Sequence, residues 1–369
     1  IHSHPELGCG EFKSSEYLAA RLGAHGFRVE KPMKSLPTAF CASKKGGKPG
    51  PALGFISEYD ALPEIGHGCG HNLIAASGFG AAVALAPFAD SLGGSVWLFG
   101  TPAEESSSAK SSMVRAGIFD RLDAAIMMHP ESMYMVNTLS LALDALRFRF
   151  TGRASHASST PYEGINALDA MIQFFNGIGM LRQQLKSDAR IHGIITKGGT
   201  FPNIIPDLTE AEFYVRAGQR DYLNAVSRKV KNCAKGAAAA AGCRVRISAF
   251  EPPVDNIINN PVLAGLVEKN LKGLGVRHIE PRDEVPGSSD FGNVSHCVPS
   301  LYFYCATAPK GSDLHTKEFA RLSVRPLAHK NLIIAVKAMA LTGLELLRHP
   351  VLLKQIRTSF RAAAKKQHI

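Results

Sequence analysis

The chain has 369 residues and a formal net charge of +11, with 45% hydrophobic and 20% charged residues. These proportions are typical of a globular enzyme, and the length favours two domains over a single hydrophobic core. No apolar run reaches the roughly 18 residues that a membrane-spanning helix requires, and no segment resembles a secretory signal. Because the chain begins at Ile1 without a methionine, we expect the native N-terminus to be missing.

Cysteine spacing and charge distribution indicate the cellular compartment and the kinds of partner to expect. The seven cysteines are dispersed without the spacing of a disulfide framework, which favours a reducing compartment, and we expect a cytoplasmic protein. The basic residues are spread over segments such as 44–48, 228–235 and 354–366 and form no compact motif with interleaved aromatic residues. We therefore interpret the charge as a solvated basic surface and predict neither nucleic acid nor a membrane as a partner.

The N-terminal part of the chain alternates helices with short apolar strands. Segment 14–25 predicts a helix, with Ser14 at its start and apolar residues at helical spacing. The Gly/Ala-rich segment 75–89 predicts a buried helix. Apolar runs predict buried strands at 51–57, 95–100 and 124–128. This alternation predicts a layered α/β domain with a mixed sheet.

From about residue 142 the strands change to an alternation of apolar and charged residues. Segment 145–152 (ALRFRFTG) is typical of a half-buried antiparallel strand. Further strands are expected at 191–196, 209–216 and 244–250, and helices at 167–184 and 222–241. The resulting β-α-β-β-α-β order predicts a small α+β domain, an open sheet with helices on one face.

After Pro252-Pro253 the first pattern returns, with a helix at 261–274 and an apolar strand at 300–304. The simplest interpretation is a small domain inserted into a larger one. We predict a discontinuous catalytic domain of residues 1–141 and 253–369, and an inserted domain of residues 142–251.

Four short segments concentrate residue types that bind metals. They are Ser57 to Asn72 (SEYDALPEIGHGCGHN), Thr101 to Ser106 (TPAEES), Met127 to Pro130 (MMHP) and Asp313 to Thr316 (DLHT). Three of them directly follow predicted strands, and ligands of open α/β sheets gather at the carboxyl ends of strands. We therefore expect these three segments to face one crevice.

Cys69 and His71 flank Gly70 in a glycine-rich loop, which can direct both side chains to one centre. An isolated buried cysteine is usually an inert thiol, and an isolated histidine is more often a core or capping residue. Their combination in HGCGH favours metal binding. Thiolate, imidazole and carboxylate together suit zinc or manganese better than calcium or magnesium.

The other candidate residues differ in the strength of their local signal. Glu104 and Glu105 directly follow the strand at 95–100, where one carboxylate can bind metal while its neighbour acts as a base in hydrolysis. His129 ends an apolar strand, which is an unfavourable place for an imidazole without a partner. His315 has no distinguishing local signal among the fourteen histidines.

The chain resembles metallopeptidase family twenty, in the branch of amidohydrolases with a cysteine metal ligand. That branch includes p-aminobenzoyl-glutamate hydrolases, indole-acetyl-amino-acid hydrolases and β-alanyl-lysine dipeptidases. The order and joint presence of the matching segments are more specific than any one of them. The segments are HPELG (4–8), EYDALPEIGHGCGHNL (58–73), GTPAEE (100–105), MMHP (127–130), GRASHASSTPYEGINALDA (152–170), GGTFPNIIPD (198–207), SSDFGNVS (288–295) and DLHTKEF (313–319).

The resemblance implies a site for two divalent metal ions, manganese or zinc. Cys69 would be a ligand shared by both ions. His71 and His129 would complete the coordination of one ion, and Glu105 with His315 that of the other.

The resemblance also implies roles outside the ligand set. Glu104 would be the general base, and Asp60 would support the metal centre. The inserted domain would be a lid through which two subunits form a homodimer, with His192 and Asn203, and also His156, near the partner's active site. Each of these three has an ordinary alternative, as a surface histidine, a turn asparagine and a helix cap.

One segment departs from the pattern of the family. After VPS, where relatives continue with His and Pro before an aromatic residue, this chain has Tyr302 and Phe303. The two aromatic residues either line the pocket, which would suit an aromatic substrate, or pack within the sheet.

These observations predict a metal-dependent hydrolase that cleaves the amide bond of an N-acyl amino acid, aminobenzoyl-glutamate or a small dipeptide. A hydrolytic deaminase of an activated aromatic amine such as a nitroanthranilate is an alternative, because the same attack would take place at a ring carbon that bears nitrogen. A non-catalytic scaffold of the same fold is a further alternative. Glu104 and all five expected ligands are present, which disfavours the scaffold.

Overall fold

The computed structural model describes residues 1–33, 36–281 and 287–366. The chain forms two compact units, one of residues 1–140 together with the residues from 257 onward, and one of residues 141–256. The smaller unit extends beyond the predicted boundary at residue 251. The reason is that Val254 and Leu143 still pair through two backbone hydrogen bonds of 2.8 and 3.0 Å.

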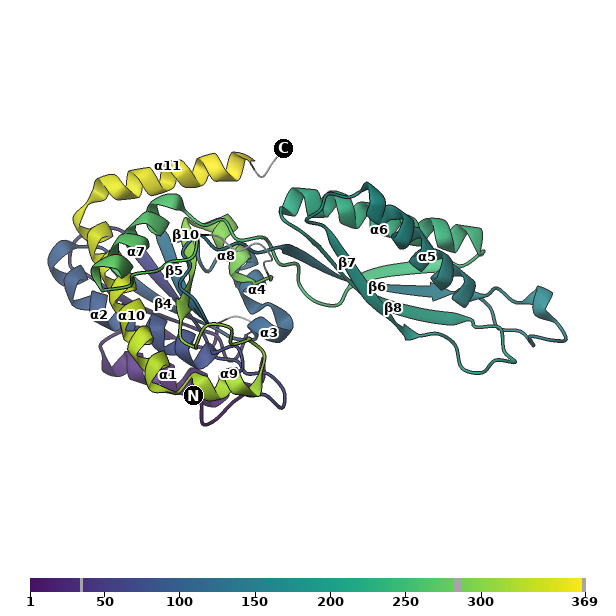
Figure 1. The fold of residues 1–369 in the computed structure, drawn as a ribbon, viewed down its shortest axis with the longest axis horizontal. Coiled ribbons are helices and arrows are strands. Elements are labelled where there is room, and N and C mark those ends of the chain that lie inside the picture. The colour runs from purple at the N-terminus through teal and green to yellow at the C-terminus, as the bar shows by residue number, and fades with distance from the viewer. Residues whose placement is uncertain (34–35, 282–286, 367–369) are drawn as a thin grey trace. The chain divides into compact units, whose positions relative to one another are not determined.

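The larger unit, on the left of Figure 1, is built on a six-stranded sheet. The strands of this sheet lie in the order β1-β2-β4-β3-β5-β10. Its strands are β1 (Arg28–Glu30), β2 (Phe40–Lys45), β3 (Ala52–Glu58), β4 (Ser95–Thr101), β5 (Ala124–Glu131) and β10 (Ser300–Ala306). Strands β3, β4, β5 and β10 are parallel, whereas β2 pairs antiparallel with both β1 and β4. The predicted α/β domain with a mixed sheet is confirmed, although β2 was not predicted.

Helices cover both faces of this sheet because successive residues of its central strands point to opposite sides. Leu98 and Ile126 enter one core with residues of α1, α2, α7 and α10, and Phe99 and Met127 enter a second core with residues of α4 and α8. The helices of this unit are α1 (Phe12–Ala24), α2 (His71–Leu92), α3 (Glu104–Ser107), α4 (Ala109–Arg115), α7 (Pro261–Gly273), α8 (Phe291–Cys297), α9 (Lys317–Leu322), α10 (Pro326–Arg348) and α11 (Pro350–Lys366).

Helix α2 is long and apolar enough to pass a length-and-composition test for a membrane span, and it is the one such helix among the described residues. It packs against β3, β4, β5 and α10. Its contacts are therefore those of a core helix, in agreement with the buried helix predicted at 75–89.

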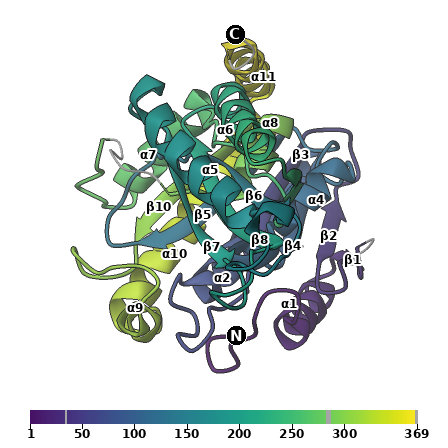
Figure 2. The same ribbon diagram turned by 90° about the vertical axis from the view of Figure 1, so that its right-hand side faces the viewer.

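The smaller unit has a four-stranded antiparallel sheet in the order β7-β8-β6-β9. Its elements are β6 (Ala142–Thr151), α5 (Ala167–Leu181), β7 (Arg190–Lys197), β8 (Leu208–Ala217), α6 (Arg220–Ala240) and β9 (Arg244–Ala249), with short 3₁₀ helices η1 (Pro161–Glu163) and η2 (Arg182–Gln184). Figure 2 shows α5 and α6 on one face of this sheet.

The alternating residues of β6 explain why only one face of the smaller sheet is covered. Phe148 and Phe150 are fully buried against Phe174 of α5. On the other face Arg147 pairs across the strands with Glu212 of β8 at 2.6 Å. A single apolar face needs a single helical layer, so α5 and α6 are sufficient.

Gly100 of β4 provides a test of the packing between β4 and β2. A Cβ at Gly100 would lie 2.1 Å from Cε1 of Phe40, which is fully buried and opposite it in the register. We expect Gly100→Ala to lower the free energy of unfolding by about 1–3 kcal/mol, as is usual when a packed core is overfilled.

The measurement is equilibrium denaturation, and Gly265→Ala is the matched control in the same unit. Gly265 lies within α7, and a Cβ there has no atom within 4 Å. Alanine at that position should stabilise the helix by about 0.5–1 kcal/mol. Equal effects of the two substitutions would contradict the described packing.

Candidate metal centre

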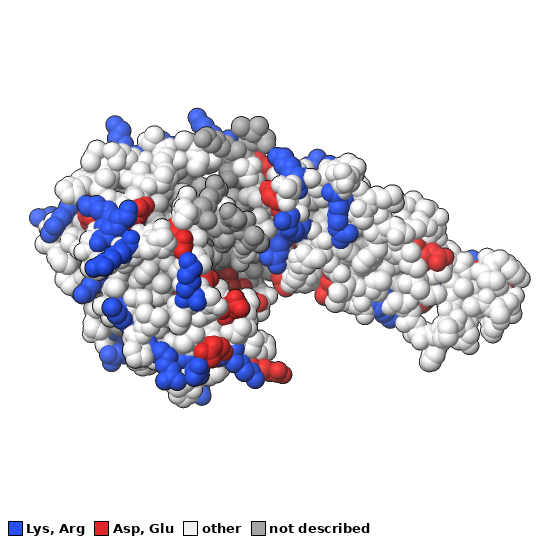
Figure 3. All heavy atoms as spheres, in the orientation of Figure 1, with Lys and Arg blue, Asp and Glu red and all other residues white. Residues whose placement is uncertain are grey.

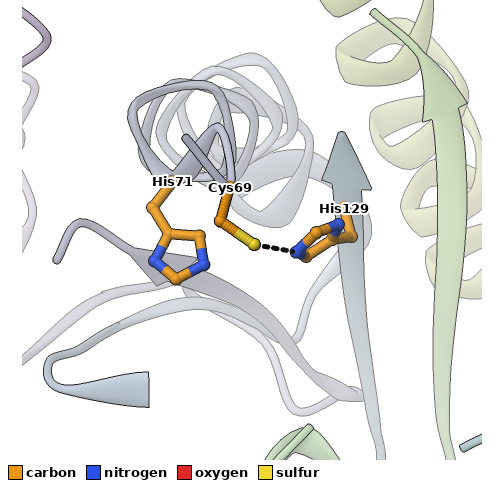
Figure 4. Close-up of side chains that lie close together, drawn as sticks. All are labelled: Cys69, His71 and His129. Carbon is orange, nitrogen blue, oxygen red and sulfur yellow. Dashed lines mark hydrogen bonds between the residues drawn. The ribbon is translucent and has the colours of Figure 1, made fainter. Parts of the chain in front are cut away.

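The loop between β3 and α2 brings Cys69 and His71 to the carboxyl edge of the central sheet. Gly70 ends the loop with a φ of +73°, in the left-handed region that favours glycine, and α2 begins at His71. A Cβ at Gly70 would lie 2.8 Å from Cγ of Pro130, so the loop packs directly on the end of β5. This contact places Cys69 beside His129 (Figure 4).

The thiol of Cys69 lies between two imidazoles. Its Sγ is 3.6 Å from Nε2 of His129, the contact drawn in Figure 4, and 3.4 Å from Nε2 of His315. His315 has a positive φ of 61°, and its N–H donates to the carbonyl of Gly68 at 2.9 Å. The Cys69 loop thus holds His315 in place, although the two residues are 246 positions apart in the sequence.

Glu105 completes the cluster at the start of the short helix α3. Its Oε1 lies 3.5 Å from Nε2 of His315 and 3.8 Å from Nε2 of His71. Donor atoms within 4.8 Å of one another therefore form two groups that share the sulfur, namely Cys69, His71 and His129, and Cys69, Glu105 and His315. His71 and Glu105 also form a group with Glu104.

The hydrogen bonds leave the correct histidine nitrogens available to a metal. Asp60 Oδ1 accepts from Nδ1 of His71 at 2.8 Å, and Nδ1 of His129 donates to the carbonyl of Pro130 at 2.8 Å. In its neutral form, an imidazole held in this way directs the lone pair of its Nε2 into the cluster. Nε2 of His71 and Oε1 of Glu105 are buried and have no hydrogen-bond partner among the described residues. A bound cation would satisfy both atoms, so the donor set fits a metal centre.

Burial and neighbouring charges set the protonation of these groups. Burial lowers the pKa of His129 to about 4, so its imidazole is neutral at neutral pH, as a metal ligand must be. Burial would raise the pKa of Asp60, but the neighbouring His71 holds it below its usual value. Burial, and next the carboxylate of Glu58, raise the pKa of Glu104 well above that of an exposed glutamate.

Asp60 also fixes the backbone that carries the acidic pair. Its second oxygen accepts from the N–H of Glu105 at 3.0 Å. The preceding Ala103 has a left-handed φ of 55°, and its N–H donates to the buried carboxylate of Glu11 at 2.7 Å. Glu11 was not predicted from the sequence, because it lies just beyond HPELG and has no motif of its own.

A second set of charged residues lies beside the cluster and was not predicted either. Nζ of Lys110 lies 2.7 Å from Oε1 of Glu58 and also contacts Oδ1 of Asp290. Oxygens of Glu58, Glu104 and Asp290 lie within 4.8 Å of one another. Glu58 and Asp290 belong to the quoted segments EYDALP and SSDFGNVS and could have been noted there, whereas nothing local distinguishes Lys110.

The two aromatic residues that depart from the family pattern pack within the sheet. Phe303 is fully buried in the core with α2 and α10, and Tyr302 is 4% exposed in the opposite core. The ring of Tyr302 is 5.6 Å from that of His129 and 5.5 Å from that of Phe291. Tyr302 thus supports the His129 ring, and the sequence-based reason to expect an aromatic substrate is removed.

The three lid residues belong to the smaller unit and not to the cluster. His192 is exposed on β7 with its ring 5.8 Å from that of Tyr214. Asn203 is exposed between β7 and β8, and its carbonyl accepts from Ala157 N–H at 3.0 Å. His156 Nδ1 accepts from the N–H groups of residues 158 and 159 at 3.3 Å, which is a local turn contact.

Comparison with known proteins defines the class. Residues 54–340 match the model of peptidase family M20/M25/M40. The chain is 35% identical to the Xaa-Arg dipeptidase of Mus musculus over 100% of this chain and 89% of that protein. It is 31% identical to a p-aminobenzoyl-glutamate hydrolase chain of Escherichia coli over 96% of this chain and 89% of that protein.

A solved structure of a dinuclear metal-binding peptidase of family M20 from Bacillus subtilis has the same fold. It superposes with a TM-score of 0.72 at 22% identity, covering 94% of this chain and 95% of that one. The family match and the two relatives show that the chain belongs to peptidase family M20/M25/M40. It is accordingly a hydrolase of the amide-bond-cleaving type.

Proposed function

We propose that this hydrolase cleaves dipeptides or N-acyl amino acids with two divalent ions, manganese or zinc, held by the two ligand groups around Cys69. The observation that carries the proposal is the shared sulfur together with two buried atoms, Nε2 of His71 and Oε1 of Glu105, that have no hydrogen-bond partner among the described residues. Donors of this kind, with a thiolate, imidazoles and a carboxylate, match the preferences of borderline transition metals.

The protein's own groups can carry the remaining steps. A divalent pair supplies Lewis-acid polarisation and acidification of water when it is bound. Glu104, next to Glu105 and half-buried at the start of α3, accepts the proton of the attacking water and returns it to the departing nitrogen. Asp60 and the carbonyl of Pro130 hold the imidazoles of His71 and His129 in one orientation.

The relatives named above direct the search for a substrate. A dipeptide with a C-terminal arginine is the first compound to test, followed by aminobenzoyl-glutamate, N-acyl amino acids and a nitroaniline. Release of a free amino acid supports the proposal. If ammonia from the nitroaniline is the only product, the enzyme is a deaminase and the proposed amide substrates are wrong.

Cys69→Ser tests the shared ligand. A hydroxyl is a much poorer bridge than a thiolate, so we expect the metal content per chain to fall sharply together with the activity. Metal content is measured by elemental analysis after dialysis. Cys41→Ser, which removes a buried thiol of the sheet outside the cluster, is the matched control. Full metal content in Cys69→Ser would refute the site.

Glu104→Gln tests the general base. The amide keeps the volume of the side chain but cannot accept a proton, so metal content should be unchanged while kcat falls by about 10²–10⁴-fold. Steady-state kinetics and elemental analysis on the same preparation separate the two effects. A fall in kcat of less than tenfold would assign the base to another residue.

We further propose that the smaller unit forms a homodimer through β7, the edge strand of its sheet. Along this strand Ile194 is 65% and Ile195 43% exposed, and seven of its eight residues are exposed. An unpaired, apolar edge strand tends to pair with another strand. A second copy of the same strand about a two-fold axis satisfies both edges at once. The homologous lid supports the further proposal that His192 and Asn203 serve the partner's active site.

Subunit complementation tests this arrangement. We expect a mixture of inactive Glu104→Gln and inactive His192→Ala to regain activity after subunit exchange, because one site of each heterodimer would then carry neither substitution. A monomer at assay concentration would exclude the proposal, and so would a failure to regain activity once exchange is shown by labelled subunits.

A further inference from the structure

Lys110 is a fully buried lysine at the start of α4, close to the candidate base. Its ammonium forms ion pairs with Glu58 and Asp290, which are 0% and 1% exposed. The backbone N–H of Lys110 donates to the other oxygen of Asp290 at 2.9 Å. Lysine is rarely buried without a reason, because transfer of an ammonium out of water is costly unless it is paired.

The surroundings of Lys110 have the composition of a metal site. Glu58, Glu104 and Asp290 place carboxylate oxygens within 4.8 Å of one another, as ligands of one ion would lie. A group made only of carboxylates suits a hard cation such as Mg²⁺, in contrast to the thiolate and imidazoles around Cys69. Oε2 of Glu58 is buried and has no hydrogen-bond partner among the described residues. Its nearest charged contact outside the cage is Nε2 of His71, at 3.4 Å.

We propose that the Lys110 ammonium is the permanent cation of this carboxylate cage and keeps divalent metal ions out of it. The consequence concerns Glu104, which is shared by the cage and the catalytic centre. Among the described residues, Lys110 forms close ion pairs with Glu58 and Asp290, whereas it attracts the carboxylate of Glu104 only from a greater distance. The ammonium thus balances the cage while Glu104 stays unbound, whereas a metal ion in the cage would take Glu104 as a ligand.

Lys110 is accordingly a positioning residue. The inference depends on the proposed function only in assigning the role of base to Glu104. Metal exclusion itself is independent of catalysis and can be measured on a protein that is not turning over.

The experiment is a count of Mg²⁺ bound to protein already loaded with zinc or manganese. The Lys110→Ala variant opens the cage, and equilibrium dialysis should show about one more Mg²⁺ per chain than in the wild type. The double variant Lys110→Ala/Asp290→Asn should lose this extra ion. A folded Lys110→Ala protein that binds no more Mg²⁺ than the wild type would overturn the proposal, as would Mg²⁺ in the wild type that Asp290→Asn removes.

Thermal unfolding provides an independent measurement that distinguishes charge from volume. Lys110→Arg keeps the charge and should remain folded, whereas Lys110→Met keeps only the volume and should be clearly less stable. Added Mg²⁺ should raise the Tm of Lys110→Ala but not that of Lys110→Met, whose side chain fills the cage. If Lys110→Met is as stable as Lys110→Arg, no cation is required and the proposal fails, whether or not Lys110→Ala folds.

These results also separate this inference from the proposed function. If the Cys69 site holds no metal, the wild type will contain no zinc or manganese, and yet the Mg²⁺ count of Lys110→Ala can still be read. If only the cage is misinterpreted, Cys69→Ser will lose metal as expected while Lys110→Ala gains none.

Discussion

The candidate metal centre depends on one constraint, which is that the charge of its buried carboxylates must be compensated. Glu58, Asp60 and Asp290 are each at most 1% exposed, at the edge of an otherwise apolar sheet. A buried carboxylate is tolerated only with a cation or with hydrogen-bond donors directed at it. Lys110 of α4 is the cation for both Glu58 and Asp290. Asp60 is compensated by His71 of α2 and by the backbone N–H of Glu105 in α3. Compensation therefore determines where α2, α3, α4 and α8 can lie.

The parallel strands bring the site residues to one edge of the sheet, and charge compensation then holds them there. The chain leaves β3, β4 and β5 at the same edge, so the segments that follow these strands must meet. Cys69, Glu105 and His129 come from these three exits. His315 arrives from a loop beyond β10 and is held by a backbone hydrogen bond to Gly68.

The surface shows no comparable grouping of one charge. On the face drawn in Figure 3, basic side chains are distributed with acidic ones between them.

The sequence predicted the buried strands of the parallel sheet but missed β2 and the long helix α10. Buried strands such as β3 and β4 have continuous apolar runs, whereas β2 ends in charged residues (FCASKK) and is recognisable only through its pairing with β4. At the site, Cys69, His71 and the two adjacent glutamates share short segments with glycine or strand signals. His315 could be chosen only by family resemblance, because its approach to Cys69 spans 246 positions.

Lys110 is the clearest example of a residue whose burial and partners could not be predicted from the sequence. The residue stands in a polar stretch (SSSAKSS), where a solvated surface lysine would be expected, and it is nevertheless fully buried. Its partner Asp290 is 180 positions away, and no local periodicity records such a pairing.

A tethered ammonium differs physically from a bound metal ion at the same place. Its local concentration is fixed by the chain, so the compensation of Glu58 and Asp290 does not vary with the supply of metal. It donates hydrogen bonds to oxygen without forming the coordination bonds that would withdraw a carboxylate from proton transfer. The proposed site would therefore combine two kinds of cation. In the proposed arrangement the coordinated ions would act on the substrate, and the covalently attached charge of Lys110 would keep the neighbouring Glu104 available as a base.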